Sequence, residues 1–151
     1  MPEPTAAARP ATSGAATLLL VEDDGPLAGL VARHLEAHGF PTTIAESAED
    51  GERLLAEGLR PALVLLDINL PGDTGWSLLR SGEYEDAGSP PVVVVSATRI
   101  PSAKLRAFDI HGYLPKPFSM DTLIETVRRH TSDEPGDGLD TLDIRADGVA
   151  R

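Results

Sequence analysis

Three short segments of this sequence are apolar at every position, and they restrict the possible folds more than any other feature. They are Leu18–Val21, Leu63–Leu66 and Val92–Val95. Strands of this kind are buried on both faces, as in a parallel sheet that helices cover on both sides. Weaker strand signals occur at residues 42–45 and 112–114. The sequence therefore predicts five strands.

Stretches with the apolar spacing of helices separate these strands. They carry Leu27 to Leu35, Leu54 and Leu55, Trp76 to Leu79, the residues after Pro101, and Met120 to Val127. Ser47 and Ser119 stand where the second and fifth helices would be capped, and Gly39 and Gly58 where the first and second would end. Five strands alternating with five helices predict a doubly wound α/β fold.

The two ends of the sequence differ in composition from the part between them. Residues 1–16 are mostly Ala, Pro, Thr and Ser, which predicts a flexible arm. Residues 131–151 hold six acids and two arginines, which predicts a flexible acidic tail. The domain itself is expected over residues 17–130.

Polar residues follow the predicted strands at the ends where ligands bind in such sheets. Glu22 and Asp23 follow the first strand, Asp67 ends the third, Ser96 the fourth, and Lys116 follows the fifth. Two carboxylates about 4 Å apart repel by roughly 4 kcal/mol at an effective dielectric near 20. Clustered carboxylates therefore require cations. Lys116 supplies one, and all-oxygen ligation favours Mg²⁺ as the other. Asp67 could then act as a nucleophile that accepts a phosphoryl group, with Ser96 donating its hydroxyl to it.

At this point the sequence resembles the receiver domains of two-component response regulators. Four stretches carry the resemblance over about residues 17–130. They are Leu20-Val21-Glu22-Asp23-Asp24, Leu66-Asp67-Ile68-Asn69-Leu70-Pro71-Gly72, Val95-Ser96-Ala97 and Tyr113-Leu114-Pro115-Lys116-Pro117-Phe118. The family's fold is flavodoxin-like, with strand order 2-1-3-4-5.

The resemblance implies a role for each matched residue. Asp67 would be the phosphoacceptor, and Lys116, ahead of a cis proline bond, would pair with the phosphoryl group. Ser96 and the amide of Ala97 would hold the phosphate, and Tyr113 would be the aromatic that swings inward when the Ser96 hydroxyl is drawn to the phosphate. The implied metal ligands are Glu22, Asp23, Asp67 and the carbonyl of Asn69.

One interval departs from the family pattern. The stretch between Ser96 and Lys116 is about two residues shorter than usual, and Asp109 stands where a glycine often ends the fourth helix. We therefore expect an unusual surface around the fourth helix, while the site itself is complete. Trp76, near Asp67 in sequence, is interpreted as a packing residue.

These features predict a stand-alone bacterial response regulator, cytoplasmic and not an enzyme beyond its own phosphorylation and dephosphorylation. It would take the phosphoryl group from a histidine kinase or a histidine phosphotransfer protein and then change a contact with a downstream protein. The net charge is −11, and the tail is acidic and too short for a helix-turn-helix, so no nucleic-acid partner is expected. No membrane insertion is expected either. The protein would be a monomer or a dimer that forms on phosphorylation.

Two other functions remain open. A phosphorylation-independent adaptor could keep this fold, and the unusual fourth-helix region favours it. An aspartyl-nucleophile phosphatase could use Asp67, but it needs a second acid two residues later, where this sequence has Asn69. Nucleotide-binding motifs rich in glycine are absent from the sequence.

Overall fold

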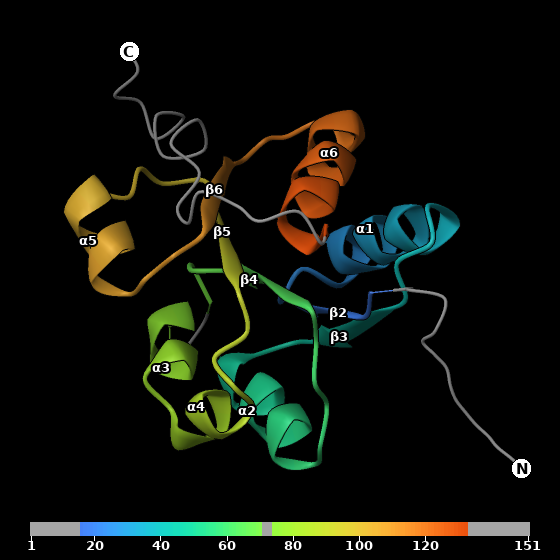
Figure 1. Cartoon of the computed structure of the whole chain (residues 1–151). Coiled ribbons are helices and arrows are strands. Elements are labelled where there is room, and N and C mark those ends of the chain that lie inside the picture. The colour runs from blue at the N-terminus through green and yellow to red at the C-terminus, as the bar shows by residue number, and fades with distance from the viewer. Residues whose placement is uncertain (1–15, 71–73, 133–151) are drawn as a thin grey trace, which may run out of the picture.

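The computed structural model describes residues 16–70 and 74–132, and its strands form one parallel sheet (Figure 1). The strands are β2 (Leu18–Val21), β3 (Thr42–Ala45), β4 (Leu63–Asp67), β5 (Val92–Ser96) and β6 (Gly112–Pro115). The helices are α1 (Gly25–Ala37), α2 (Ala48–Ala56), α3 (Gly75–Leu79), α4 (Gly82–Asp86), α5 (Ser102–Ala107) and α6 (Met120–Thr131). The arm expected over 1–16 lies outside the described residues except at residue 16. The tail expected over 131–151 lies outside them except at residues 131–132.

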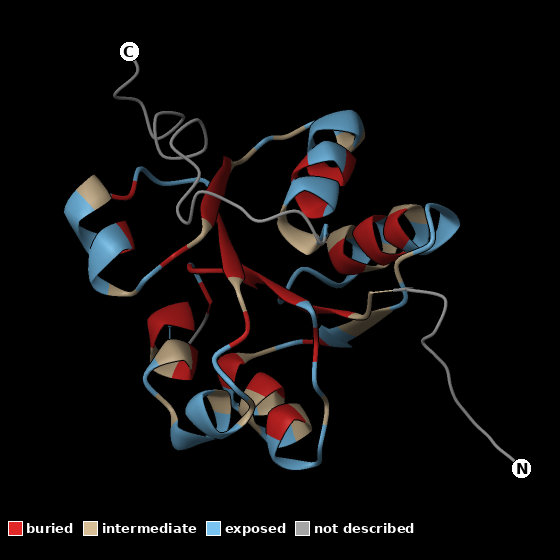
Figure 2. Ribbon diagram, in the orientation of Figure 1, coloured by how far each residue is buried: buried red, intermediate tan, exposed pale blue. Residues whose placement is uncertain are grey.

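The strand order is β3-β2-β4-β5-β6, which is the expected 2-1-3-4-5 arrangement of a doubly wound sheet. Leu18 pairs with Thr42 on one side and with Leu63 on the other, so β2 lies inside the sheet. The three strands predicted from fully apolar runs are the three inner strands. Their residues are all buried, as Figure 2 shows in red.

Helices cover both faces of this sheet, because alternate residues of each strand point to opposite sides. Leu18 and Leu20 pack with residues of α1 and α6, such as Leu35 and Leu123. Leu19 and Val21 belong to the core on the other face, with residues of α2, α3 and α5. Figure 1 shows the same division, with α1 and α6 together on one side.

The helix count differs from the expected five, because the third helical stretch is two short helices. Arg80 is the C-cap of α3, and Ser81 caps α4 by accepting a hydrogen bond from the backbone N–H of Tyr84 at 3.1 Å. Serine at such a position competes with the helix by bonding its own backbone. The Tyr84 hydroxyl donates to the carbonyl of Pro90 at 2.7 Å, which ties α4 to the start of β5.

The other expected caps are present, with one small change. Ser47 and Ser119 accept hydrogen bonds from the backbone N–H groups of Asp50 and Thr122. Pro101 is the N-cap of α5 and not its first helical residue, and it makes no side-chain cap bond. Beyond α5, Asp109 adopts a φ of 58°, a left-handed conformation that glycine tolerates better. The chain therefore uses an aspartate where the family often has glycine.

Candidate functional site

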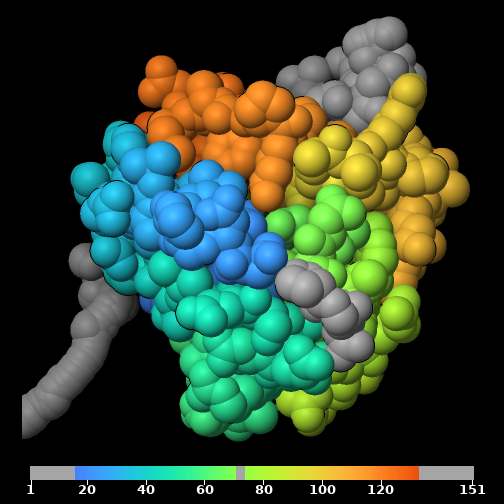
Figure 3. All heavy atoms as spheres, turned by 180° about the vertical axis from the view of Figure 1, so that it is seen from behind, coloured from blue at the N-terminus to red at the C-terminus, as the bar shows by residue number. Residues whose placement is uncertain are grey.

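The segments that follow β2, β4, β5 and β6 meet on one face of the molecule. Figure 3 shows this face, where blue, green, yellow and orange segments adjoin. The meeting is a consequence of topology, because parallel strands all present their carboxyl ends at one edge. The sheet thus brings together side chains that are up to 94 positions apart in sequence, as for Glu22 and Lys116.

Three carboxylates lie together at this edge. Glu22, Asp23 and Asp67 each offer one oxygen, and these oxygens all lie within 4.8 Å of one another. Glu22 and Asp67 are each only 4% exposed, whereas Asp23 is exposed. Two of the three charges therefore have little access to water, and their mutual repulsion must be offset by neighbouring groups.

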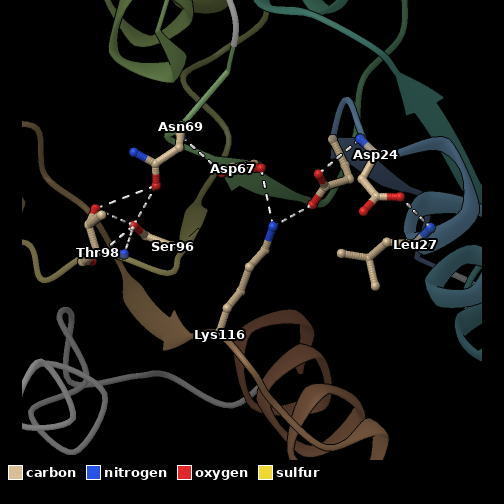
Figure 4. A network of polar contacts seen from close by, with 8 residues as sticks. Asp24, Leu27, Asp67, Asn69, Ser96, Thr98 and Lys116 are labelled. Atoms are coloured by element: carbon tan, nitrogen blue, oxygen red, sulfur yellow. Dashed lines mark hydrogen bonds and ion pairs between the residues drawn. The ribbon is translucent and has the colours of Figure 1, made fainter.

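Lys116 supplies part of that compensation (Figure 4). Its Nζ donates to Glu22 Oε1 at 3.0 Å and to Asp67 Oδ2 at 3.3 Å. Backbone N–H groups also contribute: that of Asp24 donates to Glu22 Oε2 at 3.1 Å, and that of Asn69 to Asp67 Oδ1 at 2.9 Å. One ammonium against three carboxylates leaves a charge of about −2, which suits a divalent cation.

The pKa values of the pair reflect this environment. Burial raises the pKa of the Glu22 carboxyl, the charge of Asp67 adds to the rise, and the hydrogen bond from Lys116 opposes it. Burial acts to lower the pKa of the Lys116 ammonium, but its bonds to Glu22 and the charge of Asp67 outweigh burial and raise it. Lys116 therefore stays charged at neutral pH.

Asp24 has a different role from its acidic neighbours. Its Oδ1 accepts a hydrogen bond from the backbone N–H of Leu27 at 3.0 Å, which caps α1. The run Glu22-Asp23-Asp24 therefore contains two members of the carboxylate cluster and one helix cap.

Ser96 points away from the carboxylates and toward the segments after β4 and β5. Its Oγ lies 2.9 Å from Asn69 Oδ1 and 2.9 Å from Thr98 Oγ1, and it accepts from the backbone N–H of Thr98 at 3.0 Å. Since a serine hydroxyl carries one hydrogen, it donates to one of these acceptors at a time. Sequence reasoning did not predict the Asn69 side-chain contact, because it depends on two loop conformations.

Tyr113 is buried, and its hydroxyl donates to the carbonyl of Thr98 at 3.2 Å. The aromatic residue and the Ser96 segment are therefore in contact. The Lys116-Pro117 peptide bond is cis, as expected. Ala97, which follows Ser96 directly, is exposed at the same edge.

Gly75 allows α3 to approach the end of β4 closely. A Cβ atom on Gly75 would lie 2.7 Å from the backbone oxygen of Asp67 and 3.0 Å from Ile68 Cδ1. Such distances are too short for an L side chain without movement of the backbone. This glycine therefore fixes the position of the helix next to the carboxylate cluster, a role with no sequence signal beyond the glycine itself.

A hollow of about 670 Å³ opens beside the cluster. Its lining includes Asp23, Asn69 and Thr98, together with the apolar side chains of Trp76 and Ile100. Trp76 is 8% exposed and belongs to the core, in agreement with its interpretation as a packing residue, but it also borders this hollow.

Comparison with known proteins identifies what this chain is similar to. Residues 18–128 match the sequence model of the response regulator receiver domain. An uncharacterized transcriptional regulatory protein of Bacillus subtilis, YvcP, is 35% identical over 122 residues, covering 78% of this chain and 50% of that protein. The DNA-binding response regulator MtrA of Mycolicibacterium paratuberculosis is 33% identical over 134 residues, covering 86% of this chain and 59% of the relative.

Solved structures show the same architecture. The receiver domain of the Francisella response regulator 1452 has a TM-score of 0.67 and 26% identity, with 77% of this chain and 96% of that chain covered. A CheY-like receiver domain protein from Methanospirillum hungatei has a TM-score of 0.71, 24% identity, and coverage of 78% and 94%. The second likeness supports the fold alone.

One sequence-based expectation is wrong. The absence of a nucleic-acid partner was inferred from the acidic charge and the short tail, yet relatives such as MtrA are named as DNA-binding regulators. The chain spans about half the length of the curated relatives it matches. The charge of this chain therefore carries no information about what the unmatched part of a relative contacts.

Over residues 16–70 and 74–132, the structure has no helix both long enough and apolar enough to cross a membrane.

Proposed function

Because the chain belongs to the response regulator receiver family, we propose that it accepts a phosphoryl group on Asp67 and transmits this event through a changed protein contact. The observation that carries the proposal is the position of Asp67. Its carboxylate ends an inner strand, is 4% exposed, and lies 3.3 Å from the Lys116 ammonium within a cluster of three carboxylates. A buried, charge-paired carboxylate at a sheet edge is a typical setting for covalent phosphoryl transfer.

The transfer is proposed to occur from a phosphohistidine of a histidine kinase or phosphotransfer protein. An oxygen of Asp67 attacks the phosphorus, the P–N bond breaks, and the imidazole leaves with the bonding electrons and takes up a proton. The product is an acyl phosphate on Asp67. Lys116 would neutralise charge on the transferred group, and the backbone N–H of Asn69 would keep the carboxylate oriented through its 2.9 Å hydrogen bond.

The carboxylate cluster fits a divalent metal ion. Glu22, Asp23, Asp67 and the carbonyl of Asn69 would hold Mg²⁺, because hard oxygen donors and a residual charge near −2 match its preferences. When bound, Mg²⁺ would neutralise charge on the phosphoryl oxygens. Glu22, with its raised pKa, would ionise fully once a cation is close.

The response would involve Ser96, Ala97 and Tyr113. In the described arrangement the Ser96 hydroxyl is engaged with Asn69 and Thr98. We propose that a phosphoryl group on Asp67 draws the Ser96 hydroxyl and the Ala97 amide toward it. Tyr113 would take or keep an inward position when Ser96 moves, and its hydroxyl already donates to the Thr98 carbonyl from a buried ring.

The output proposed from the relatives is control of transcription, since several are named as transcriptional or DNA-binding regulators. The proposal concerns the receiver domain that this chain provides. It holds whether the DNA-binding part that responds to phosphorylation belongs to the same protein or to a separate one. Cross-linking of tagged chain in its native cells, followed by sequencing of co-purified DNA, tests this output. Equal DNA recovery from untagged cells would contradict it.

The experiment for the central proposal is intact-protein mass spectrometry after incubation with acetyl phosphate and Mg²⁺. Wild-type protein should gain one phosphoryl group, and Asp67→Asn should gain none. The matched control is Asp24→Asn, because asparagine caps helices as well as aspartate does and Asp24 lies next to the cluster. This control should label like wild type. Failure of the wild type to label, with beryllofluoride also without effect, would favour the phosphorylation-independent adaptor.

A further inference from the structure

Four side chains form a stack that joins α3 to α5, and the function proposed above uses none of them. The rings of Trp76 and Phe108 have centroids 4.7 Å apart and are tilted by 31°. Lys104 Nζ lies 5.0 Å from the centre of the Trp76 ring and 5.9 Å from that of Phe108. Arg80, at the end of α3, lies 5.7 Å from the Phe108 centroid. We call these four residues the α3–α5 stack.

The stack is connected to the phosphoacceptor edge on both sides. On the α3 side, Trp76 follows Gly75, whose Cα approaches the Asp67 carbonyl so closely that a Cβ would not fit. Trp76 also borders the hollow that Asn69 and Thr98 line. On the α5 side, only residues 97–101 separate β5 from α5. The stack therefore joins the segment after Asp67 to the helix that follows Ser96.

Movement of Ser96 toward a phosphoryl group has a mechanical consequence for α5. Residues 97–101 would be drawn toward Asp67, and α5 follows them directly in the chain. Ile100 is 5% exposed and packs in the same core cluster as Trp76 and Leu105. The connecting segment is therefore anchored in the core and cannot move far without moving α5. For α5 to follow, its contacts with α3 must change.

We propose that the α3–α5 stack holds α5 in its unphosphorylated arrangement and thereby limits how readily Asp67 accepts a phosphoryl group. This inference rests on the proposed function, which it extends to regulation of the same site. A contact made in one of two states shifts the equilibrium toward that state, and a ligand of the other state must overcome it. Weakening the stack therefore strengthens binding of phosphoryl groups and their analogues.

A purely structural role for the stack makes a different prediction. Leu105 is fully buried, so α5 also contacts the core outside the stack. If the stack only added stability to both states, its loss would lower thermal stability and leave the affinity for a phosphoryl analogue unchanged. The analogue affinity therefore separates the two roles.

The test is a beryllofluoride titration of the full chain in Mg²⁺, followed by the emission of Trp76, which is the only tryptophan. The variants are Phe108→Leu, which removes a ring, and Lys104→Gln, which removes a charge. Aromatic pairs and exposed cation–π contacts predict midpoints lowered about 3- to 10-fold and about 2- to 4-fold respectively. Midpoints are compared, not intensities, because the variants alter the surroundings of Trp76.

Each variant has a matched control. Phe40→Leu removes a ring that packs against the opposite face of the sheet. Arg106→Gln removes a charge from α5 itself, and none of the stack contacts among the described residues involves Arg106. Both controls should have midpoints within about twofold of wild type, because neither removes a contact of the stack.

A second measurement does not depend on phosphorylation. Amide hydrogen exchange of residues 102–108 in the unmodified protein should be about 3- to 10-fold faster in Phe108→Leu than in Phe40→Leu. Midpoints equal to those of the controls, or unchanged exchange in α5, overturn the stack proposal alone. A wild-type titration indistinguishable from that of Asp67→Asn instead overturns the proposed function, and the stack proposal with it.

Discussion

Lys116 is the residue on which the charge balance of the site depends most. Its ammonium pairs with both buried carboxylates, Glu22 and Asp67, which otherwise accept only backbone N–H groups among the described contacts. Removing one partner of a buried ion pair costs roughly 3–5 kcal/mol, because the remaining charges are left without compensation. With the Lys116 side chain 22% exposed, water penetration would reduce this cost.

We predict that Lys116→Ala destabilises the fold by about 2–3 kcal/mol near pH 7 and by less near pH 4.5. The pKa of Glu22 is already raised in the folded protein and should rise further without the lysine. A carboxyl whose pKa is higher in the folded protein than in the unfolded chain stabilises the fold at a pH below the unfolded pKa, here 4.5. This stability is lost as the pH rises through the folded pKa, so the variant should be less destabilised near pH 4.5 than near pH 7. Urea denaturation at the two pH values checks this.

The control for Lys116→Ala is Arg33→Ala, which removes an exposed cation from α1. Its effect should be within about 0.5 kcal/mol at both pH values. A defect in Lys116→Ala that is independent of pH would show that the carboxylates are compensated by something other than the lysine.

At the residue scale, the sequence predicted which side chains meet but not every contact they make. Asp67, Lys116 and Glu22 could be brought together by reasoning from strand ends, because parallel topology places those ends at one edge. The bonds of Asn69 and Thr98 to the Ser96 hydroxyl could not. They depend on how two loops from different strands fold, and a motif does not specify this.

At the scale of elements, the packing of α3 on the end of β4 depends on Gly75. We predict that Gly75→Ala destabilises the protein by about 1–3 kcal/mol, the usual cost of overpacking, and slows labelling by acetyl phosphate. The physical reason is that the new Cβ would lie 2.7 Å from the Asp67 backbone oxygen, so either α3 or the phosphoacceptor must shift.

Gly82→Ala is the matched control, because Gly82 opens α4 and a Cβ there meets nothing within 4 Å. It should be neutral or stabilising by up to about 1 kcal/mol, since alanine favours helix more than glycine does. Thermal denaturation of both variants and their labelling rates make the comparison. Equal stability of the two variants would mean that α3 does not pack as described.

A second element, α4, is tied to β5 by Tyr84. Burial, with a contribution from Asp109, raises the pKa of the Tyr84 phenol to about 12. The stability due to this raised pKa is present below the unfolded value of 10.0 and is lost as the pH rises through about 12. Alkaline titration of phenolate absorbance, compared with Tyr84→Phe, should reveal this late ionisation, and ionisation near the ordinary value would contradict the buried Tyr84–Pro90 bond.

The boundaries of helices and strands could be predicted where the apolar periodicity was strong. The prediction failed where a helix cap interrupted that periodicity. The apolar strands and the capping serines Ser47 and Ser119 were clear in the sequence. The break between α3 and α4 was not predicted, although the Ser81-Gly82 pair and the change from basic Arg80 to acidic Glu83 mark it in the sequence. The Ser81 hydroxyl donates to the carbonyl of Leu78 in α3 and accepts from the backbone N–H of Tyr84 in α4, so it lies between the two helices and bonds to both.

At the scale of the whole molecule, metal binding should be coupled to folding. A ligand that binds only the folded state adds RT ln(1 + [L]/Kd) to its stability, about 1.4 kcal/mol at a concentration tenfold above Kd. We predict that Mg²⁺ raises the melting temperature of wild type, whereas Asp23→Asn shows a much smaller shift. Asp23 is exposed, so its substitution should leave the metal-free fold unchanged.

The fold as a whole was predictable from the sequence, whereas the partner class was not. The five strands, their order and the edge where the site lies follow from apolar runs and the receiver motifs. The net charge of −11 argued against nucleic acid, and the DNA-binding relatives contradict that conclusion. The net charge of this chain does not report what its relatives contact through their remaining length.

The measurement that most directly tests the account is borohydride reduction of the protein after incubation with acetyl phosphate and Mg²⁺, followed by peptide mass spectrometry. Reduction converts an aspartyl phosphate to homoserine and so marks the residue that carried the group. The account predicts homoserine at position 67 alone, dependent on Mg²⁺. Homoserine at position 23 or 24, or a label that persists in Asp67→Asn, would contradict it.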